Sequence, residues 1–133
     1  ALKLGARVAE AARWPGCAGI HAAAADAAAT AALVGARLAG LRASIAGRGR
    51  EVYAEGADLA LKLQEADVAV AACAEMAEDF KRLAPHARVR AVPAAVDAEW
   101  FRPEPEVARN GRLLCLAPLL PRTGLPLLVE ALA

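Results

Sequence analysis

Three short segments of the sequence carry the residue types that could contact a small ligand. They are residues 21–26, 47–53 and 117–124, and each follows an apolar run of strand length. The first begins with His21, and the second is rich in Gly and Arg and ends with Tyr53. If the apolar runs are parallel strands, these segments follow their carboxyl ends, where ligands bind in open α/β sheets.

The common metal and nucleotide motifs are absent from the sequence. Cys17, Cys73 and Cys115 are well separated, and His21 and His86 are isolated. A structural zinc site needs about four clustered ligands, so no metal site is predicted. The sequence has neither GxGxxG nor GxxxxGK[ST], which places an unrelated nucleotide-binding fold last among the hypotheses. We expect reduced, buried cysteines and no cofactor.

Alternating helices and short strands must position the three segments. Short apolar runs predict strands at residues 19–22, 43–46, 68–72, 88–92 and 113–116. Helical periodicity predicts helices at residues 2–13, 26–39, 57–65, 75–83 and 125–132. Continuously apolar strands are typical of a parallel sheet covered on both faces, and their alternation with helices indicates βαβ units. We therefore predict an α/β fold, a Rossmann-like parallel sheet with helices on both faces.

Composition and charge exclude several classes of protein. The chain of 133 residues fits about one domain, but 38 of them are Ala, so the 58% apolar content overstates the core. The formal net charge is +1 and the Arg residues are scattered, which argues against nucleic-acid binding. No uncharged apolar run reaches the ~18 residues of a membrane span.

Two stretches in the first part of the chain resemble segments of glycosyltransferase family 4, whose members build polysaccharides. Residues 20–25 read Ile-His-Ala-Ala-Ala-Ala and look like the family's I-H-A-H-F-A strand and turn. Residues 48–59 are similar to its H-A-x-D-I-Y-x-x-G-A-D-L segment. Residues 72–75, Ala-Cys-Ala-Glu, stand where the family continues to T-C-T-E.

Two later stretches resemble the hinge and the second domain of the same family. Residues 92–103 look like V-x-H-G-V-D-x-x-x-F-R-P, with Ala94-Ala95 in place of His-Gly. Residues 112–124 are similar to I-L-x-V-G-R-L-x-x-x-K-G, and residues 127–132 continue as the family does. The order and spacing of all these stretches together carry the resemblance, which covers nearly the whole chain.

The resemblance implies a bacterial two-domain (GT-B type) enzyme of the exopolysaccharide or colanic-acid kind. Such an enzyme transfers a sugar from a nucleotide-sugar to a saccharide or lipid-linked acceptor in cell-surface polysaccharide biosynthesis. Residues 1–96 would be part of the acceptor-side Rossmann-like domain, residues 97–111 the hinge, and residues 112–133 the start of the nucleotide-sugar domain. We expect the remaining strands and the paired-glutamate motif to lie outside these residues, so that the chain alone is inactive.

The same resemblance supplies candidate site residues. Its catalytic positions fall on Arg48, in place of His, and on Glu51, in place of Asp. Its substrate-binding positions are His21, Tyr53, Arg122, Thr123 and Gly124.

Each of three candidate site residues also has a structural interpretation. A solvated loop arginine is the favoured interpretation of Arg48, and a satisfied structural histidine that of His21. Glu51 either binds sugar hydroxyls or caps the following turn.

Departures from the family pattern support an alternative function. Pro118 and Thr123 replace the two cations that face the leaving diphosphate, and a single preorganised contact of that kind is worth about 3 kcal/mol. The alternative is a degenerate, non-catalytic homologue that acts as a binding or scaffold module. We expect a cytoplasmic location. Lys3, Arg7 and Arg13 favour a helix packed on the sheet, and the alternative for them is peripheral contact with the inner membrane.

Overall fold

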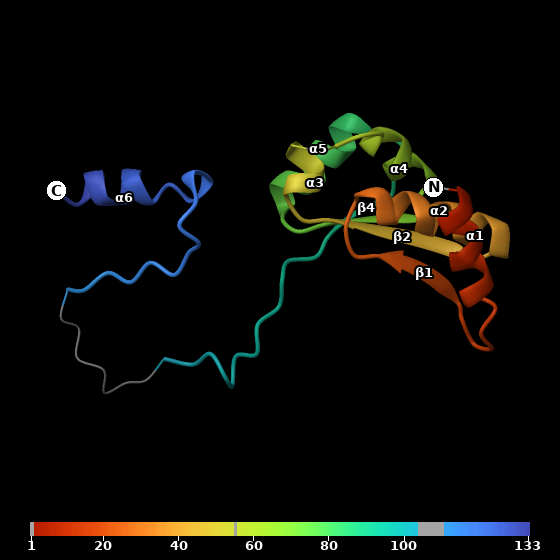
Figure 1. Ribbon diagram of the computed structural model, residues 1–133, viewed down its shortest axis with the longest axis horizontal. Coiled ribbons are helices and arrows are strands. Elements are labelled where there is room, and N and C mark those ends of the chain that lie inside the picture. Colours follow the sequence, from red (N-terminus) through yellow and green to blue (C-terminus); the bar gives the residue numbers. More distant parts are fainter. Residues whose placement is uncertain (1, 55, 104–110) are drawn as a thin grey trace. The chain divides into compact units, whose positions relative to one another are not determined.

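The computed structural model describes residues 2–54, 56–103 and 111–133, and the chain divides into two units, Ala1–Val96 and Asp97–Ala133. Each unit is described by itself. The first contains a sheet with helices packed against it, and the second contains two short helical segments (Figure 1). Residues 104–110 of the expected hinge lie outside the described residues.

A four-stranded parallel sheet forms the centre of the first unit. Its strands are β1 (Gly19–Ala22), β2 (Arg42–Gly47), β3 (Val68–Ala71) and β4 (Val89–Ala91), and their order in the sheet is the order in the chain. All three neighbouring pairs are parallel. The predicted α/β fold with a Rossmann-like parallel sheet is therefore confirmed.

Helices connect the strands. They are α1 (Leu2–Ala11), α2 (Ala27–Ala39), α3 (Arg50–Tyr53), α4 (Leu59–Glu65) and α5 (Ala74–Leu83). The clearest boundaries are those of α2, because the Asp26 carboxylate accepts a hydrogen bond from the Ala28 amide at 2.8 Å and Gly40 ends the helix with φ 67°. The sequence predicted all of these helices except the short α3.

The hydrophobic core lies on one face of the sheet. Ala22, Ile45, Ala69 and Val89 are register partners across the four strands, and all four are buried against the helices. Crossovers between parallel strands are right-handed, and here each crossover leads to the next strand in the same direction across the sheet. The connecting helices therefore lie on the same face. On the opposite face, Val68 and Val70 stay half-buried. The second layer of helices expected there is not found among the described elements.

Small residues dominate this core. The largest fully buried side chains are Phe80, Ile45 and Leu63, and most of the others are Ala. Phe80 of α5 fits beneath the end of β2, because a Cβ atom on Gly47 would lie 2.4 Å from the Phe80 ring. Gly47 therefore lets α5 approach the strand that leads into the segment at residues 47–53.

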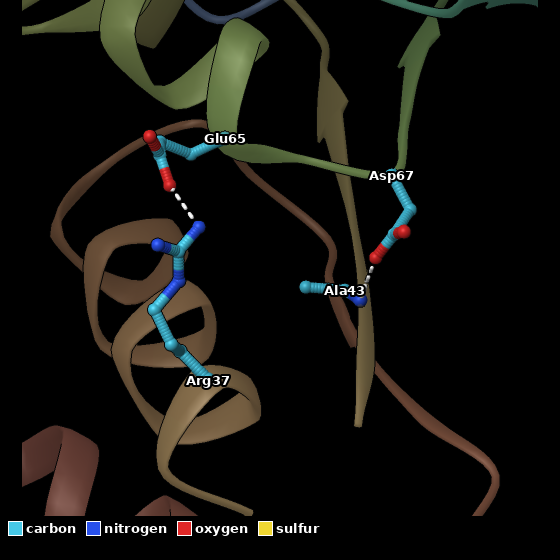
Figure 2. Close-up of polar contacts among 4 residues, drawn as sticks. All are labelled: Arg37, Ala43, Glu65 and Asp67. Atoms are coloured by element: carbon cyan, nitrogen blue, oxygen red, sulfur yellow. Dashed lines mark hydrogen bonds and ion pairs between the residues drawn. The ribbon is translucent and has the colours of Figure 1, made fainter. Parts of the chain in front are cut away.

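Polar contacts fasten the opposite, amino end of the sheet. The Asp67 carboxylate, just before β3, accepts a hydrogen bond from the Ala43 amide of β2 at 2.8 Å (Figure 2). The Asp67 amide in turn donates to the Ala43 carbonyl at 2.8 Å. This two-way contact fixes the β2–β3 register. Figure 2 also shows Arg37 of α2 paired with Glu65 of α4. Both side chains are largely exposed, so this pair contributes little to stability.

Helix α1 packs chiefly on α2, whereas the sequence predicted a helix packed on the sheet. Gly5 of α1 and Gly35 of α2 make the close approach, because a Cβ atom on Gly35 would lie 2.6 Å from a Val8 methyl and 3.0 Å from the Gly5 carbonyl oxygen. A Cβ atom on Gly5 would likewise lie 2.4 Å from a Val34 methyl. Neither glycine can be enlarged without moving one helix away from the other.

The second unit contains the 3-10 helix η1 (Pro121–Thr123) and the helix α6 (Leu125–Ala131). The predicted helix at its end is confirmed, whereas the strand predicted at residues 113–116 is wrong. No described residue of this unit forms a strand beside it, and a lone strand leaves its amides and carbonyls unpaired. Leu114 and Leu116 are 92% and 96% exposed.

The cysteines are also more exposed than predicted. Cys17, Cys73 and Cys115 are free thiols, as expected, but Cys17 is half-buried and the other two are exposed. Cys73 occupies the N-cap position of α5, outside the core, and Cys115 lies in the non-regular part of the second unit. The expectation of buried cysteines is therefore wrong.

The α1–α2 packing gives a stability prediction. Gly35→Ala is expected to lower the free energy of unfolding by about 1–3 kcal/mol, although Ala favours an exposed helix by about 1 kcal/mol over Gly. Urea unfolding followed by circular dichroism measures the change. Val8→Gly in the same molecule removes both the methyl and the Cβ atom that a Cβ atom on Gly35 would meet at 2.6 and 2.8 Å, so Val8→Gly/Gly35→Ala should be more stable than the sum of the two single effects predicts. Additive effects would contradict the close approach.

Candidate functional site

The segment after β2 forms a compact turn at the carboxyl edge of the sheet. It runs from Gly47 into α3, and the Glu51 carboxylate accepts a hydrogen bond from the Arg48 backbone amide at 2.7 Å. This hydrogen bond closes the turn that leads into α3 and gives Glu51 a structural role beside the sugar-binding role weighed for it from the sequence. The Arg48 side chain is exposed at this edge.

Tyr53 joins α3 to α5 through a hydrogen bond. Its hydroxyl donates to Asp79 Oδ2 at 2.8 Å, and Arg82 binds the other oxygen of the same carboxylate. The hydrogen bond to Asp79, helped by desolvation and by the carboxylate charge, raises the pKa of Tyr53 above its ordinary value. The hydrogen bonds from Tyr53 and Arg82 lower the pKa of Asp79.

A shallow hollow of about 370 Å³ lies beside this contact. Its lining is mostly apolar, with Val52 and Leu83 among its walls, and Tyr53, Asp79 and Arg82 supply its polar groups. The exposed Tyr53 ring can stack on a ligand, and the neighbouring hydroxyl, carboxylate and guanidinium can form hydrogen bonds to it. Tyr53 is 62% exposed and is therefore accessible from solvent.

Lys62 connects two loops on the same side of the sheet. Its ammonium donates to the carbonyl of Ala25, before α2, at 3.1 Å and to the carbonyl of Ala57, before α4, at 2.8 Å. The side chain is nearly buried, with 7% of its surface exposed. This contact also holds the loop where Asp58 adopts a left-handed backbone with φ 55°, which is unfavourable for a residue with a side chain.

His21 does not lie with Tyr53. Its Nδ1 is 2.8 Å from the Ser44 hydroxyl, its register partner on β2. The side chains at these two positions alternate with the buried Ala22 and Ile45, so they belong to the face opposite the helices. Tyr53 contacts α5 on the helix-covered side. His21 therefore has a satisfied polar partner, as its structural interpretation predicts.

Thr123 and Gly124 belong to the second unit, where they shape a turn. The Thr123 hydroxyl lies 2.6 Å from the Leu120 carbonyl oxygen and 3.1 Å from that of Pro118. Gly124 has φ 67° and separates η1 from α6. The side chain of Arg122 lies outside the described part of the chain, and a common site of this turn with Arg48 and Glu51 stays a prediction.

The hinge motif also has a local structural role. Asp97 Oδ1 accepts hydrogen bonds from the Glu99 and Trp100 amides at 3.0 and 3.2 Å. Its carbonyl accepts from the Phe101 amide at 2.8 Å. The retained Asp97 and Phe101 therefore begin and end one tight turn, which explains their spacing.

Four residues at these contacts were not predicted from the sequence. Asp79 and Arg82 pair at the i, i+3 spacing of a helix surface, which is a readable but common signal. Lys62 stands among Leu residues in α4, and Ser44 among apolar residues in β2. A lone polar residue in an apolar run was the available signal for both.

Other site types find no support in the described residues. Among residues 2–54, 56–103 and 111–133, no three His, Cys, Asp or Glu side chains gather where they could hold a metal ion. In the same residues, no helix has the length and apolar character needed to cross a bilayer.

No protein-family model matches this chain, and a search of curated proteins gives no match either. The resemblance to glycosyltransferase family 4 is thus carried by the sequence motifs alone.

The Tyr53–Asp79 hydrogen bond gives a titration prediction. Asp79→Asn should lower the Tyr53 pKa toward the ordinary tyrosine value, because the acceptor carboxylate and its charge are removed. The chain has one Tyr, so the ultraviolet absorbance of the phenolate follows this residue alone. Glu78→Gln removes one negative charge from the same helix and is the matched control. An equal shift in both variants would mean that the hydrogen bond has no part in it.

The same contact fixes a direction for stability against pH. The pKa of Tyr53 is raised in the folded state. Its hydrogen bond therefore contributes to the free energy of unfolding below the ordinary tyrosine pKa, and this contribution is lost as pH rises through the folded-state pKa. The lowered pKa of Asp79 affects stability at acidic pH. Its contribution is present above the ordinary aspartate pKa and is lost as pH falls through the folded value.

The Lys62 contact predicts a loss of stability on truncation of its charge. Lys62→Met should lower the free energy of unfolding by about 1–3 kcal/mol, because two backbone carbonyls lose their donor. Lys81→Met is the control, because Lys81 pairs with Glu78 at the exposed surface and its truncation should cost no more than about 1 kcal/mol. Equal losses in the two variants, measured by urea unfolding, would show that Lys62 does not connect the loops.

Proposed function

We propose that this chain is part of a glycosyltransferase that moves a sugar from a nucleotide-sugar to a saccharide or lipid-linked acceptor. The observation that carries the proposal is the order of the family 4 motifs along a parallel α/β sheet. The motif at residues 20–25 covers β1 and its following turn, and the motif at residues 48–59 follows β2. Both motifs therefore supply loops at the carboxyl edge, which is where such sheets bind ligands.

In this proposal Arg48 is the group that faces the charged part of a substrate. Its backbone amide is held by the Glu51 carboxylate, while its guanidinium is exposed and offers a fork of donors to a phosphate or carboxylate. Tyr53 and the hollow beside it supply stacking and hydroxyl contacts. The nucleotide-sugar is a substrate, and the proposal includes no cofactor. A cytoplasmic protein, with peripheral contact to the inner membrane for lipid-linked acceptors, belongs to the same proposal.

A second candidate is a homologue that binds ligands without catalysing transfer. The observation in its favour is that two of the expected site residues form hydrogen bonds within their own turns. Glu51 holds the Arg48 amide, and the Thr123 hydroxyl bonds to turn carbonyls where the family has a cation. A diphosphate leaving group develops charge that such neutral or engaged groups do not stabilise.

Calorimetric titration and a transfer assay separate these two functions. The full-length protein is titrated with UDP-glucose and GDP-mannose, and sugar release is then followed. A transferase binds one donor and turns it over, and Arg48→Ala should reduce turnover by about tenfold or more because a charge-stabilising contact is lost. Arg7→Ala, on the exposed side of α1, removes the same charge and should leave turnover unchanged.

The opposite results identify the non-catalytic homologue or reject both functions. Binding without turnover, together with transfer gained in Arg48→His/Pro118→Arg/Thr123→Lys, would support the homologue. Absence of binding to every nucleotide-sugar and acceptor tested would contradict both proposals.

A further inference from the structure

The face of the sheet opposite the helices carries an ordered row of polar and basic residues. His21, Ser44 and Val68 are register partners on β1, β2 and β3. Arg88, directly before β4, continues the row beside Val68, and its carbonyl accepts a hydrogen bond from the Ala69 amide. Arg42 stands two residues before Ser44 and therefore points to the same face. Neighbouring strands lie about 4.8 Å apart, so the long Arg side chains reach across the row.

These residues surround a hollow of about 250 Å³. Ser44 and Val68 lie in the row between His21 and Arg88, and Arg42 is also part of the lining. One water molecule takes about 30 Å³ in the liquid, so the hollow has room for a tetrahedral oxyanion together with waters. This hollow is separate from the Tyr53 contact on the helix-covered side.

The basic groups at this hollow are available for a ligand. Within the described residues, the guanidinium groups of Arg42 and Arg88 form no ion pair and no side-chain hydrogen bond. Asp67 is the acidic residue of the lining, and one of its carboxylate oxygens accepts the Ala43 amide (Figure 2). The lining thus holds two Arg residues and a histidine against one carboxylate, which already accepts a hydrogen bond, so basic groups predominate in the hollow.

The His21–Ser44 pair presents a donor whichever way its hydrogen bond runs. If the Ser44 hydroxyl donates to Nδ1, the proton of the neutral imidazole is on Nε2 and is free for a ligand. If Nδ1 donates to Ser44, the Ser44 hydroxyl hydrogen is free instead. When the imidazole is protonated, Nδ1 donates to Ser44, and both the Nε2 proton and the Ser44 hydroxyl hydrogen are free for a ligand. Together with two guanidinium forks, this pair matches the several acceptor oxygens of a phosphate group.

We propose that the hollow formed by His21, Arg42, Ser44 and Arg88 on the uncovered face of the sheet binds a phosphate group, free or as a phosphate monoester. The site is independent of the proposed sugar transfer and lies on the other face of the sheet. Phosphate is favoured over a single carboxylate because it has more acceptor oxygens for the several donors that line the hollow.

The test is a titration of the protein with inorganic phosphate and with glycerol phosphate, followed by calorimetry and by the imidazole resonances of the two histidines. The His21 resonances should move on addition of phosphate, and His21→Gln identifies them. Arg42→Gln/Arg88→Gln should weaken binding by about tenfold or more. Asp67→Asn keeps an acceptor for the Ala43 amide but removes a negative charge, so it should strengthen binding.

Arg7→Gln/Arg13→Gln is the matched control, because it removes the same charge from the exposed residues of α1 and the turn after it. Circular dichroism establishes that each variant is folded. Absence of phosphate binding, or equal weakening in both double variants, would overturn the proposal. So would binding to phosphatidylserine vesicles with no response to either soluble phosphate, because the basic face would then recognise a membrane surface and not a phosphate group.

Discussion

The close approach of small residues is the constraint on which this structure depends. Helices α2, α4 and α5 lie on a sheet whose inward side chains are mostly Ala. Among the described residues that are fully buried, the large ones are Phe80, Ile45 and Leu63. Small residues bring backbones together but remove little apolar area from water per residue. The position of the carboxyl-edge turn therefore depends strongly on Phe80 and on the room that Gly47 leaves for it.

Most of the fold could be predicted because its signals are local. Asp26 and Gly40 mark the ends of α2 by capping chemistry, and the apolar runs at β1 to β4 are bounded by turn residues. The strand expected at residues 113–116 could not be judged in this way, because a strand exists only when another strand pairs with it. The sequence also could not predict whether helices cover one face of the sheet or both, because Val68 and Val70 are compatible with either arrangement.

The candidate site was less predictable than the fold. Sequence order could mark residues 48–53 as a strand-end segment, but not the Tyr53–Asp79 contact, whose partners are 26 positions apart. Lys62 and Ser44 could be noticed only as polar residues within apolar runs, because their partners Ala25 and His21 are distant in the sequence and are brought near by tertiary packing. The functional assignments of Arg48, Glu51, Tyr53 and the turn at residues 122–124 remain hypotheses.

The alanine-rich core also bears on how the first unit responds to temperature. The heat-capacity increase on unfolding grows with the apolar surface that becomes hydrated, and each buried Ala exposes little such surface. A core of this composition gives a smaller heat-capacity change for its length than one built from Leu, Ile and Phe. Its free energy of unfolding then varies less steeply on either side of the temperature of maximum stability, so the curve is shallow and broad and not tall and narrow.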